Sequence, residues 1–496
     1  MSIRLGGAHA AREEKPLLAP HRVAGALYVV AMFMTVMDQT IVNVALPSIA
    51  RDFEISAAAS AGAVVAYLVS MAVFIPAAGW IGDRLGTERA LLLALTLFTT
   101  ASVACALAPG NTWLVACRAV QGVGGGLAVP AATTMLYRAF PPGQRARVSW
   151  VVSMPIWLAP AVGPVLGGLL VEELSWRWAF LLNAPIGLVA IAAGAVLLRH
   201  PGRTPAGPFD ATGFVLAGAG FAGVVHAVSV APSHGWGSAL VLVTGVGGAA
   251  AIGVLVVHEL RHPAPLIDLR LLADRLFRAS NLTNAFGYGA FIAVVFLVPV
   301  YVQVALGGSP LDSGLVTAPE ALAGVAISPV VGRLYPVVGP RRLAAGGLVL
   351  TALAAVLLAR TGTGTSLWTL RALMLLTGVG FIAMYISIQA ASFTTISDGK
   401  TGHASSLFNA QRQLSAALGV AVVASILGAA APLATGAASG AAIVPAFHTA
   451  FLVAAGLLAV GAALALRIRD DDARSTIVSR HAPAAAPAAS TAAAGG

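Results

Sequence analysis

Three charged side chains stand inside long apolar segments of the sequence. Asp38 lies within the first such segment, Arg118 near the start of the fourth, and Glu320 near the middle of the tenth. A charged side chain at the centre of a bilayer costs about 2.5–3.5 kcal/mol on insertion scales, so it must face protein or water. A desolvated carboxylate gains and loses a proton as its surroundings change. The chemistry that these residues suggest is therefore proton transfer within a membrane.

Each of the three also has a structural interpretation. We expect Arg118 to approach Asp38 and to keep it ionised until a proton or substrate competes. Alternatively, Asp38 only forms hydrogen bonds, and Arg118 is a static residue that ties helices together. Glu320 is either a proton or cation site, or a packed acid that stays protonated or paired.

Membrane helices must position these residues. The chain has 496 residues, of which 58% are hydrophobic and 10% charged, with a mean hydropathy of +0.87. Soluble domains carry about 25% charged residues. Because one helical span needs roughly 20 apolar residues, the apolar runs predict an all-α polytopic membrane protein with about fourteen transmembrane helices.

The net charge of +10 follows this topology. With a cytoplasmic N-terminus, all but six of the 29 Lys and Arg fall in cytoplasmic segments. The six are Arg51, Arg177 and Arg360 outside, and Arg118, Arg371 and Arg412 within spans. This positive-inside pattern predicts a multi-pass membrane protein, surrounded by lipid, with both termini in the cytoplasm and no nucleic-acid partner.

A repeat at an offset of 253 residues divides the chain into halves. Its matched positions are Pro76 and Gly79 with Pro329 and Gly332, Gly86 with Gly339, Arg89 with Arg342, and Arg118 with Arg371. Repeated transporter halves pack around a central site. We predict a cytoplasmic segment (1–22), a six-helix bundle (23–200), two inserted peripheral helices with their loops (201–275), a second six-helix bundle (276–467) and a disordered cytoplasmic tail (468–496).

Five segments carry a family resemblance that covers roughly residues 20–470. They are the first-span sequence Met37–Pro47, the loop Gly79–Arg89 (G-W-I-G-D-R-L-G through Arg89), the fourth-span positions Arg118–Pro130, the fifth-span sequence Pro160–Gly168 (P-A-V-G-P-V-L-G-G), and Trp176–Gly187 at the start of the sixth span. Together they resemble the 14-span drug:proton antiporter branch of the major facilitator superfamily, often called the EmrB/QacA type.

The resemblance implies roles for two of these segments. The loop residues Gly79, Asp83, Arg84, Gly86 and Arg89 would form a gate, with Asp83 capping or pairing with a neighbouring helix end in one state only. The alternative is a solvated surface turn. In the second half Pro336 stands where Asp83 would repeat, and Glu88 stands where a base is more usual.

The fifth-span residues Gly163, Pro164, Gly167 and Gly168 would provide a bend and close helix packing that limit leak. For the substrate cavity we predict Gln39, Asn43, Gln121, Gln411 and Arg412, with Gln413 also near its cytoplasmic mouth. For Arg412, an anchor that reaches toward the membrane surface is the alternative.

The resemblance thus implies a proton-coupled antiporter of the plasma membrane that exports hydrophobic or amphipathic small molecules, such as drugs or antibiotics, by alternating access. We expect no enzymatic activity, no cofactor, and a monomer that draws its energy from the proton gradient. Proton-coupled uptake of a small nutrient or metabolite is the alternative within transport, and an intramembrane zinc protease or a membrane sensor is a weaker one.

Two further patterns concern a metal site and a disulfide. His258-Glu259-x-x-His262 matches the helix motif of zinc proteases, and Asp398 would supply a third ligand. Because Pro263 disfavours helical geometry at His262, we expect the two histidines not to share a helix face and predict no metal site. Cys105 and Cys117 flank a short loop, where they form either a disulfide or two buried thiols.

Overall fold

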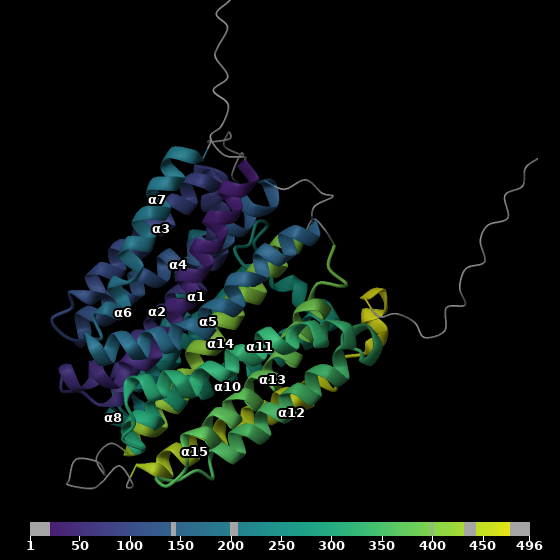
Figure 1. Ribbon diagram of the computed structural model, residues 1–496. Coiled ribbons are helices and arrows are strands. Elements are labelled where there is room, and N and C mark those ends of the chain that lie inside the picture. Colours follow the sequence, from purple (N-terminus) through teal and green to yellow (C-terminus); the bar gives the residue numbers. More distant parts are fainter. Residues whose placement is uncertain (1–19, 140–144, 199–206, 398–399, 431–442, 477–496) are drawn as a thin grey trace, which may run out of the picture.

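The computed structural model describes residues 20–139, 145–198, 207–397, 400–430 and 443–476 (Figure 1). Over these residues the regular structure is helical, with no β-strand. The first half comprises α1 (Pro20–Asp52), α2 (Ala57–Leu85), α3 (Thr87–Ala106), α4 (Asn111–Ala139), α5 (Arg145–Glu173), the short α6 (Trp178–Leu181) and α7 (Asn183–Leu197).

Two helices, α8 (Ala211–His234) and α9 (Ala239–Arg261), and the 3₁₀ turn η2 (Leu269–Ala273) connect the halves. The second half comprises α10 (Arg275–Val300) with the π-helical turn η3 (Tyr301–Ala305), α11 (Pro310–Val338), α12 (Pro340–Leu358), α13 (Leu367–Ser392), α14 (Thr401–Ala430), α15 (Val444–Ala465) and the 3₁₀ segment η7 (Asp470–Thr476).

The predicted membrane fold is confirmed. Thirteen helical segments among the described residues are long and apolar enough to cross a membrane, with α6 and α7 counted as one span. The first side chains of α5 lie outside the described residues, but its backbone forms a helix of 29 residues. With α5, the helices match the fourteen that the apolar runs predict.

The two ends of the chain depart from the predicted boundaries. The described part of helix α1 begins at Pro20. The predicted disordered tail begins with an ordered segment, η7. There Asp470 Oδ1 accepts a hydrogen bond from the Arg341 amide (3.2 Å) at the start of α12, which satisfies a free N–H of that helix. Residues 1–19 and 477–496 lie outside the described residues.

The repeat is visible at one turn in each half. Gly86 ends α2 and begins α3 with φ 88°, and Gly339 joins α11 to α12 with φ 85°. A side chain strongly disfavours this backbone conformation. The two glycines therefore allow the same sharp corner between consecutive spans of each half.

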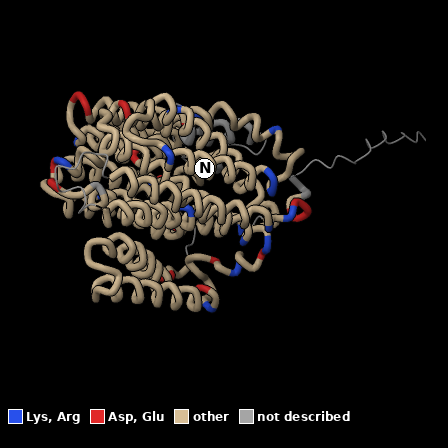
Figure 2. Tube along the Cα trace, turned by 90° about the horizontal axis from the view of Figure 1, so that it is seen from below, with Lys and Arg blue, Asp and Glu red and all other residues tan. Residues whose placement is uncertain are grey.

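The halves lie side by side as two helical bundles, the first purple to blue and the second green to yellow in Figure 1. They meet along two seams, α5 against α11 and α2 against α14. Helix α8 packs against both α2 and α14, and α9 packs on α8. The inserted pair thus lies at the periphery, over one of the seams, as predicted. Charged residues gather at the two ends of the molecule, with few between them (Figure 2).

At one end, which we call the closed end, the halves are joined by direct contacts. Gln303 Nε2 donates to the Val44 carbonyl (2.9 Å), and the Leu311 amide donates to Glu172 Oε2 (3.0 Å). A cavity of about 1340 Å³ lies between the halves and reaches the opposite end, the open end, where Asp83, Asp210 and His403 line it. The molecule is therefore held together at one end and hollow toward the other.

Candidate functional site

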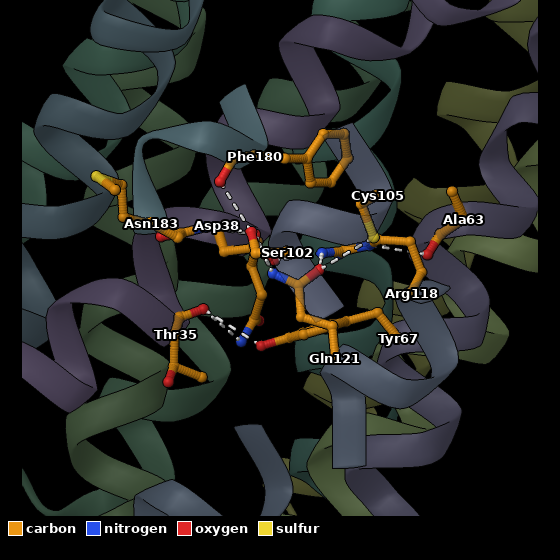
Figure 3. Close-up of polar contacts among 12 residues, drawn as sticks. Thr35, Asp38, Ala63, Tyr67, Ser102, Cys105, Arg118, Gln121, Phe180 and Asn183 are labelled. Atoms are coloured by element: carbon orange, nitrogen blue, oxygen red, sulfur yellow. Dashed lines mark hydrogen bonds and ion pairs between the residues drawn. The ribbon is translucent and has the colours of Figure 1, made fainter. Parts of the chain in front are cut away.

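The structure brings two of the predicted residues together. Asp38 on α1 and Arg118 on α4 form an ion pair between Asp38 Oδ2 and Arg118 Nη1, and both side chains are almost fully buried (Figure 3). The approach of Arg118 to Asp38 is confirmed. Breaking a buried ion pair typically costs about 3–5 kcal/mol, because the remaining charge is left without compensation.

Glycines of α4 make this approach possible. A Cβ on Gly124 would lie 2.7 Å from the Phe98 backbone nitrogen of α3, and one on Gly126 would lie 2.9 Å from the Met71 carbonyl of α2. Real side-chain atoms do not fit at such distances, so α4 can pack this closely only with glycine at these positions. The fourth-span motif therefore places Arg118 deep among α1, α2 and α3.

Two amides complete the shell of donors around Asp38. Gln121 Nε2 donates to Asp38 Oδ1 (2.8 Å), and Asn183 Nδ2 donates to the same oxygen (3.1 Å). Gln121 Oε1 in turn accepts from Arg118 Nη1 (2.8 Å). The Arg118 guanidinium and the two amide nitrogens each donate a hydrogen bond to Asp38. An ionised carboxylate can only accept hydrogen bonds. Asp38 is thus the common acceptor for Arg118, Gln121 and Asn183.

Ser102 on α3 closes the network. Its hydroxyl accepts from Gln121 Nε2 (3.2 Å) and Asn183 Nδ2 (3.1 Å), and donates to the Phe180 carbonyl (2.9 Å). We call Asp38, Arg118, Gln121, Ser102 and Asn183 the polar cluster. It joins four spans of the first half, and each member is at most 1% exposed.

Ser102 was not predicted, and Asn183 was identified only as part of a motif. A serine in an apolar helix is common and gives no sequence signal. Asn183 had one, because Pro185 follows it closely. Proline has no N–H to donate to the carbonyl of Leu181 four residues earlier, and the helix breaks there between α6 and α7. That break directs Asn183 into the cluster.

Arg118 lies between the other members of the polar cluster and the cavity. Its guanidinium carbon lies 4.2 Å from the centre of the Tyr67 ring, and both residues line the cavity, whereas Asp38 does not. Arg118 Nε also donates to the Ala63 carbonyl (3.3 Å). A proton or substrate in the cavity therefore meets the guanidinium before it meets the carboxylate.

Glu320 lies on the other side of the cavity, on α11. Its carboxylate makes no hydrogen bond or ion pair with any described residue. Nearby on the same wall, Phe291 and Phe381 stack with ring centres 3.5 Å apart, and Phe381 stacks on Tyr385 at 5.6 Å. The predicted acid is thus half-buried and faces an aromatic surface.

Arg412 belongs to this wall as well. Its Nη1 donates to the Tyr385 hydroxyl (2.6 Å), and its guanidinium carbon lies 5.3 Å from the centre of the Tyr288 ring. The alternative of an anchor reaching toward the membrane surface is wrong, because the side chain points into the cavity. We call Tyr288, Phe291, Phe381, Tyr385 and Arg412, with Glu320, the aromatic wall.

Of the other predicted cavity residues, Gln39, Asn43 and Gln413 line the cavity. Two predictions are corrected. Gln121 lies in the polar cluster, because its face of α4 packs toward α3. Gln411 accepts from Asn284 Nδ2 (3.2 Å) and donates to Ser415 (2.7 Å), so it bridges α14 to α10.

The predicted gate residues lie at the open end. Asp83 lines the cavity mouth, as do Lys400 and His403 near the start of α14. Within the described part of the chain, no ion pair involves Asp83, Arg84 or Arg89. The Arg84 guanidinium carbon lies 5.3 Å from the Trp80 ring centre.

The fifth-span glycines form tight contacts on both sides of α5. Cβ atoms on Gly163 and Gly167 would strike Thr40 and Ile41 of α1, next to Asp38, and one on Gly168 would lie 2.6 Å from the Pro310 carbonyl of α11. The predicted close packing is present, and α5 runs without interruption through Pro164. This motif connects the helix that carries Asp38 to the opposite half.

The remaining two patterns are also resolved. Cys105 and Cys117 are free thiols. The rings of His258 and His262 stack at 5.0 Å, so the expectation that they cannot share a helix face is wrong. His262 has φ −67° and ψ 134°. Only the ψ angle of His262, next to Pro263, departs from helical values. The backbone before this bond is helical, so the His262 side chain points as it would within the helix. Asp398 lies outside the described residues.

Known proteins resemble this chain in sequence and in fold. The family model described as Major Facilitator Superfamily matches residues 28–420. The chain is 32% identical to the "Putative multidrug resistance protein MdtD" of Cronobacter sakazakii, over 93% of this chain and 98% of the relative. It is 31% identical to a "Multidrug resistance protein B homolog" of Mycobacterium tuberculosis, over 82% and 76% respectively. A bacterial homologue of the human lysosomal transporter Spinster, crystallised inward-facing and unoccupied, has a similar fold (TM-score 0.66, 17% identity, 93% of this chain and 99% of that one).

Proposed function

Because the chain belongs to the Major Facilitator Superfamily and is a multi-pass membrane transport protein, we propose that it exports hydrophobic or amphipathic small molecules in exchange for protons. Its energy source would be the proton gradient across the plasma membrane. The names of the multidrug resistance relatives support drug-like cargo. The observation that carries the proton coupling is the Asp38–Arg118 pair, buried directly behind the cavity wall.

The polar cluster suggests how a proton would act. In this structure Asp38 is surrounded by donors, so it is set up as a carboxylate. A proton on Asp38 would cancel its attraction for Arg118 and leave one donor too many. Asn183 Oδ1 has no partner among the described residues, so a flipped Asn183 amide could accept the new O–H. Protonation would thereby free the guanidinium to move.

The freed guanidinium links the proton to the transport cycle. Arg118 lines the cavity, and α1 carries Asp38 against Gly163 and Gly167 of α5, which in turn packs on α11 of the other half. A shift of α1 therefore reaches the seam between the halves. Alternating access in this superfamily rocks the two halves around a fixed central site.

The open end is the cytoplasmic end in this proposal. Most described Arg residues outside the spans, such as Arg84, Arg270 and Arg341, lie there, whereas Arg51, Arg177 and Arg360 lie at the closed end, in line with the positive-inside rule. With this orientation, the open end would admit cargo from the cytoplasm. Asp83, which forms no ion pair with any described residue, would pair with the start of α14 when this end closes.

The aromatic wall supports a class of cargo. Stacked rings offer apolar contact. Tyr288 and Tyr385 already hold the positive charge of Arg412, whereas Glu320, which pairs with no described residue, offers a negative charge within a partly buried surface. A ring face and a carboxylate both attract cations. Amphipathic compounds with a flat apolar part and a positive charge would fit this wall.

The test uses purified protein in liposomes that enclose a pH-sensitive dye. A proton gradient is imposed, and lipophilic cations and neutral drugs are added to wild type, Asp38→Asn and Asp52→Asn. Asp52 is the matched control, because it lies on the same helix and pairs with Arg177, but at the closed end. We expect substrate-triggered proton movement in wild type and Asp52→Asn, and none in Asp38→Asn.

Two results would contradict the proposal. Full coupling in Asp38→Asn would make Asp38 structural and leave Glu320 as the remaining proton carrier. No proton movement with any compound, from protein that binds those compounds, would exclude proton antiport of this class of cargo.

A further inference from the structure

A cluster of potential metal ligands lies at the open end of the inserted helix pair. Asp210 caps the N-terminus of α8 by accepting from the Gly213 amide (2.8 Å), and His258 lies in the last turn of α9. His258 Nε2 is 2.8 Å from Asp210 Oδ1, and His262 Nδ1 is 4.0 Å from Asp210 Oδ2. The proposed transport cycle makes no use of these residues.

Three atoms in this cluster are buried without a hydrogen-bond partner among the described residues. They are Asp210 Oδ2, His262 Nδ1 and Glu259 Oε1. Asp210 is 5% exposed and Glu259 is fully buried. Burying a carboxylate oxygen without a partner is costly. Such atoms, converging from two helix ends, indicate that a ligand is to be accommodated there.

We propose that Asp210, His258 and His262 bind one divalent transition-metal ion of the zinc class. One ligand atom from each residue lies within 4.8 Å of the others. Zinc bonds to imidazole nitrogen and carboxylate oxygen at about 2.0–2.2 Å, so tetrahedral ligands lie about 3.3 Å apart. Small side-chain rotations would close that difference, and a fourth position would remain for water.

The Asp210 carboxylate is in the charge state that a metal ligand needs. Burial acts to raise the pKa of Asp210, but the hydrogen bond from Gly213 and the neighbouring His258 lower it below its ordinary value. The carboxylate is therefore ionised at neutral pH. Glu259 Oε2 accepts from the Ile267 amide (3.1 Å), so this acid holds the loop after α9 in place behind the ligands, as outer-shell partners of metal sites do.

A bound ion would act on the rim of the cavity. Asp210 and residues 263–266 line the open end. Next to Asp210, the Phe209 ring lies 4.7 Å from that of Trp80, whose indole nitrogen donates to the Gly207 carbonyl (2.8 Å). An ion would hold the start of α8 to the end of α9 and stiffen the contact with the end of α2, where the gate residues lie.

The test measures metal binding by the full chain, purified without a polyhistidine tag and reconstituted in nanodiscs. Co²⁺ is titrated in as the probe, because its visible absorption reports tetrahedral nitrogen and oxygen ligands, and Zn²⁺ is then added as competitor. We expect one Co²⁺ per chain with an intense band that Zn²⁺ abolishes. His258→Ala and His262→Ala should each weaken binding at least about tenfold.

His234→Ala is the matched control, because it removes a histidine from the far end of α8, where the side chain contacts Ser233. It should bind Co²⁺ like wild type. The thermal midpoint of each variant without metal shows that it is folded, and only the chain with all three ligands should gain stability from Zn²⁺. Absence of a stoichiometric site in wild type, or unchanged binding in folded His258→Ala and His262→Ala, would overturn the proposal. Neither result bears on proton antiport, which is measured separately.

Discussion

The two halves of the molecule share one framework but differ in the residues that they present at its centre. The offset of 253 residues relates α2, starting at Ala57, to α11, starting at Pro310. Across this offset three members of the polar cluster correspond to apolar residues. Asp38 corresponds to Phe291, Gln121 to Met374 and Ser102 to Ala355, whereas Arg118 corresponds to Arg371 and Tyr67 to Glu320.

The difference separates two tasks within one fold. In the first half, an arginine finds a buried acid and is held behind the cavity wall. In the second half, the corresponding Arg371 has no acid partner among the described residues and lies 4.4 Å from the Trp368 ring. The acid of that half, Glu320, faces the cavity instead. We infer that the first half is adapted to bind protons and the second to contact cargo.

The largest effect is expected when the Asp38–Arg118 pair is broken. It is compared with the removal of Arg371, the counterpart of Arg118 in the second half. Arg118→Met leaves Asp38 buried without its cation, which should cost about 3–5 kcal/mol of stability. Arg371→Met removes a residue with no buried partner and should cost less than about 1 kcal/mol. Thermal unfolding in detergent would measure both variants.

A double variant sharpens this result. Replacing both charges, as Asp38→Leu with Arg118→Met, should recover most of the lost stability, because apolar residues of similar volume can replace a buried ion pair. Proton coupling should remain absent. Equal losses in Arg118→Met and Arg371→Met would show that the halves do not differ in this respect.

The second prediction concerns the seam between the halves. Gly168→Val would push side-chain atoms into the Pro310 and Leu311 backbone of α11. Such overpacking typically costs about 1–3 kcal/mol. Here it would destabilise only the conformation in which α5 and α11 are in contact at the closed end. Gly456→Ala on α15, where a Cβ meets open space, is the control. Cysteine labelling at the closed end should rise in Gly168→Val alone.

The third prediction tests the cargo side. Glu320→Gln removes the negative charge from the aromatic wall and should weaken binding of lipophilic cations about tenfold, or roughly 1.4 kcal/mol. Neutral compounds of similar shape should bind as before. Equilibrium dialysis would compare it with Glu173→Gln, which changes an exposed acid at the closed end. Equal losses for cations and neutral compounds would contradict a charge-based role for Glu320.

The sequence predicted the fold well, because its signals are local. Apolar length predicts spans, and glycines at repeated positions such as Gly86 and Gly339 predict matching corners. The Asp38–Arg118 pair was also predictable, since a charge inside a span must face protein, another charge or water. Motif positions therefore identified most of the polar cluster.

Side-chain direction was predicted less well, because it depends on how helices rotate against their neighbours. Gln121 and Gln411 are as polar as Gln39, but packing turns them toward α3 and α10 instead of the cavity. Ser102 gave no signal because hydroxyls are common in apolar helices. The stacking of His258 and His262 was not predicted, because non-helical geometry at His262 was expected to turn its side chain away, whereas only its ψ angle departs from helical values.

The smallest effect is expected at a second pair with the same residue types. Asp52 and Arg177 are 2.9 Å apart at the closed end, with side chains 44% and 39% exposed. Exposed pairs contribute about 0–1 kcal/mol, so Asp52→Asn should shift the thermal midpoint little. If it destabilised the protein as much as Arg118→Met, burial would not be what distinguishes the two pairs. A small shift would instead attribute the cost of losing Arg118 to the desolvated carboxylate of Asp38, which is the property that a proton carrier needs.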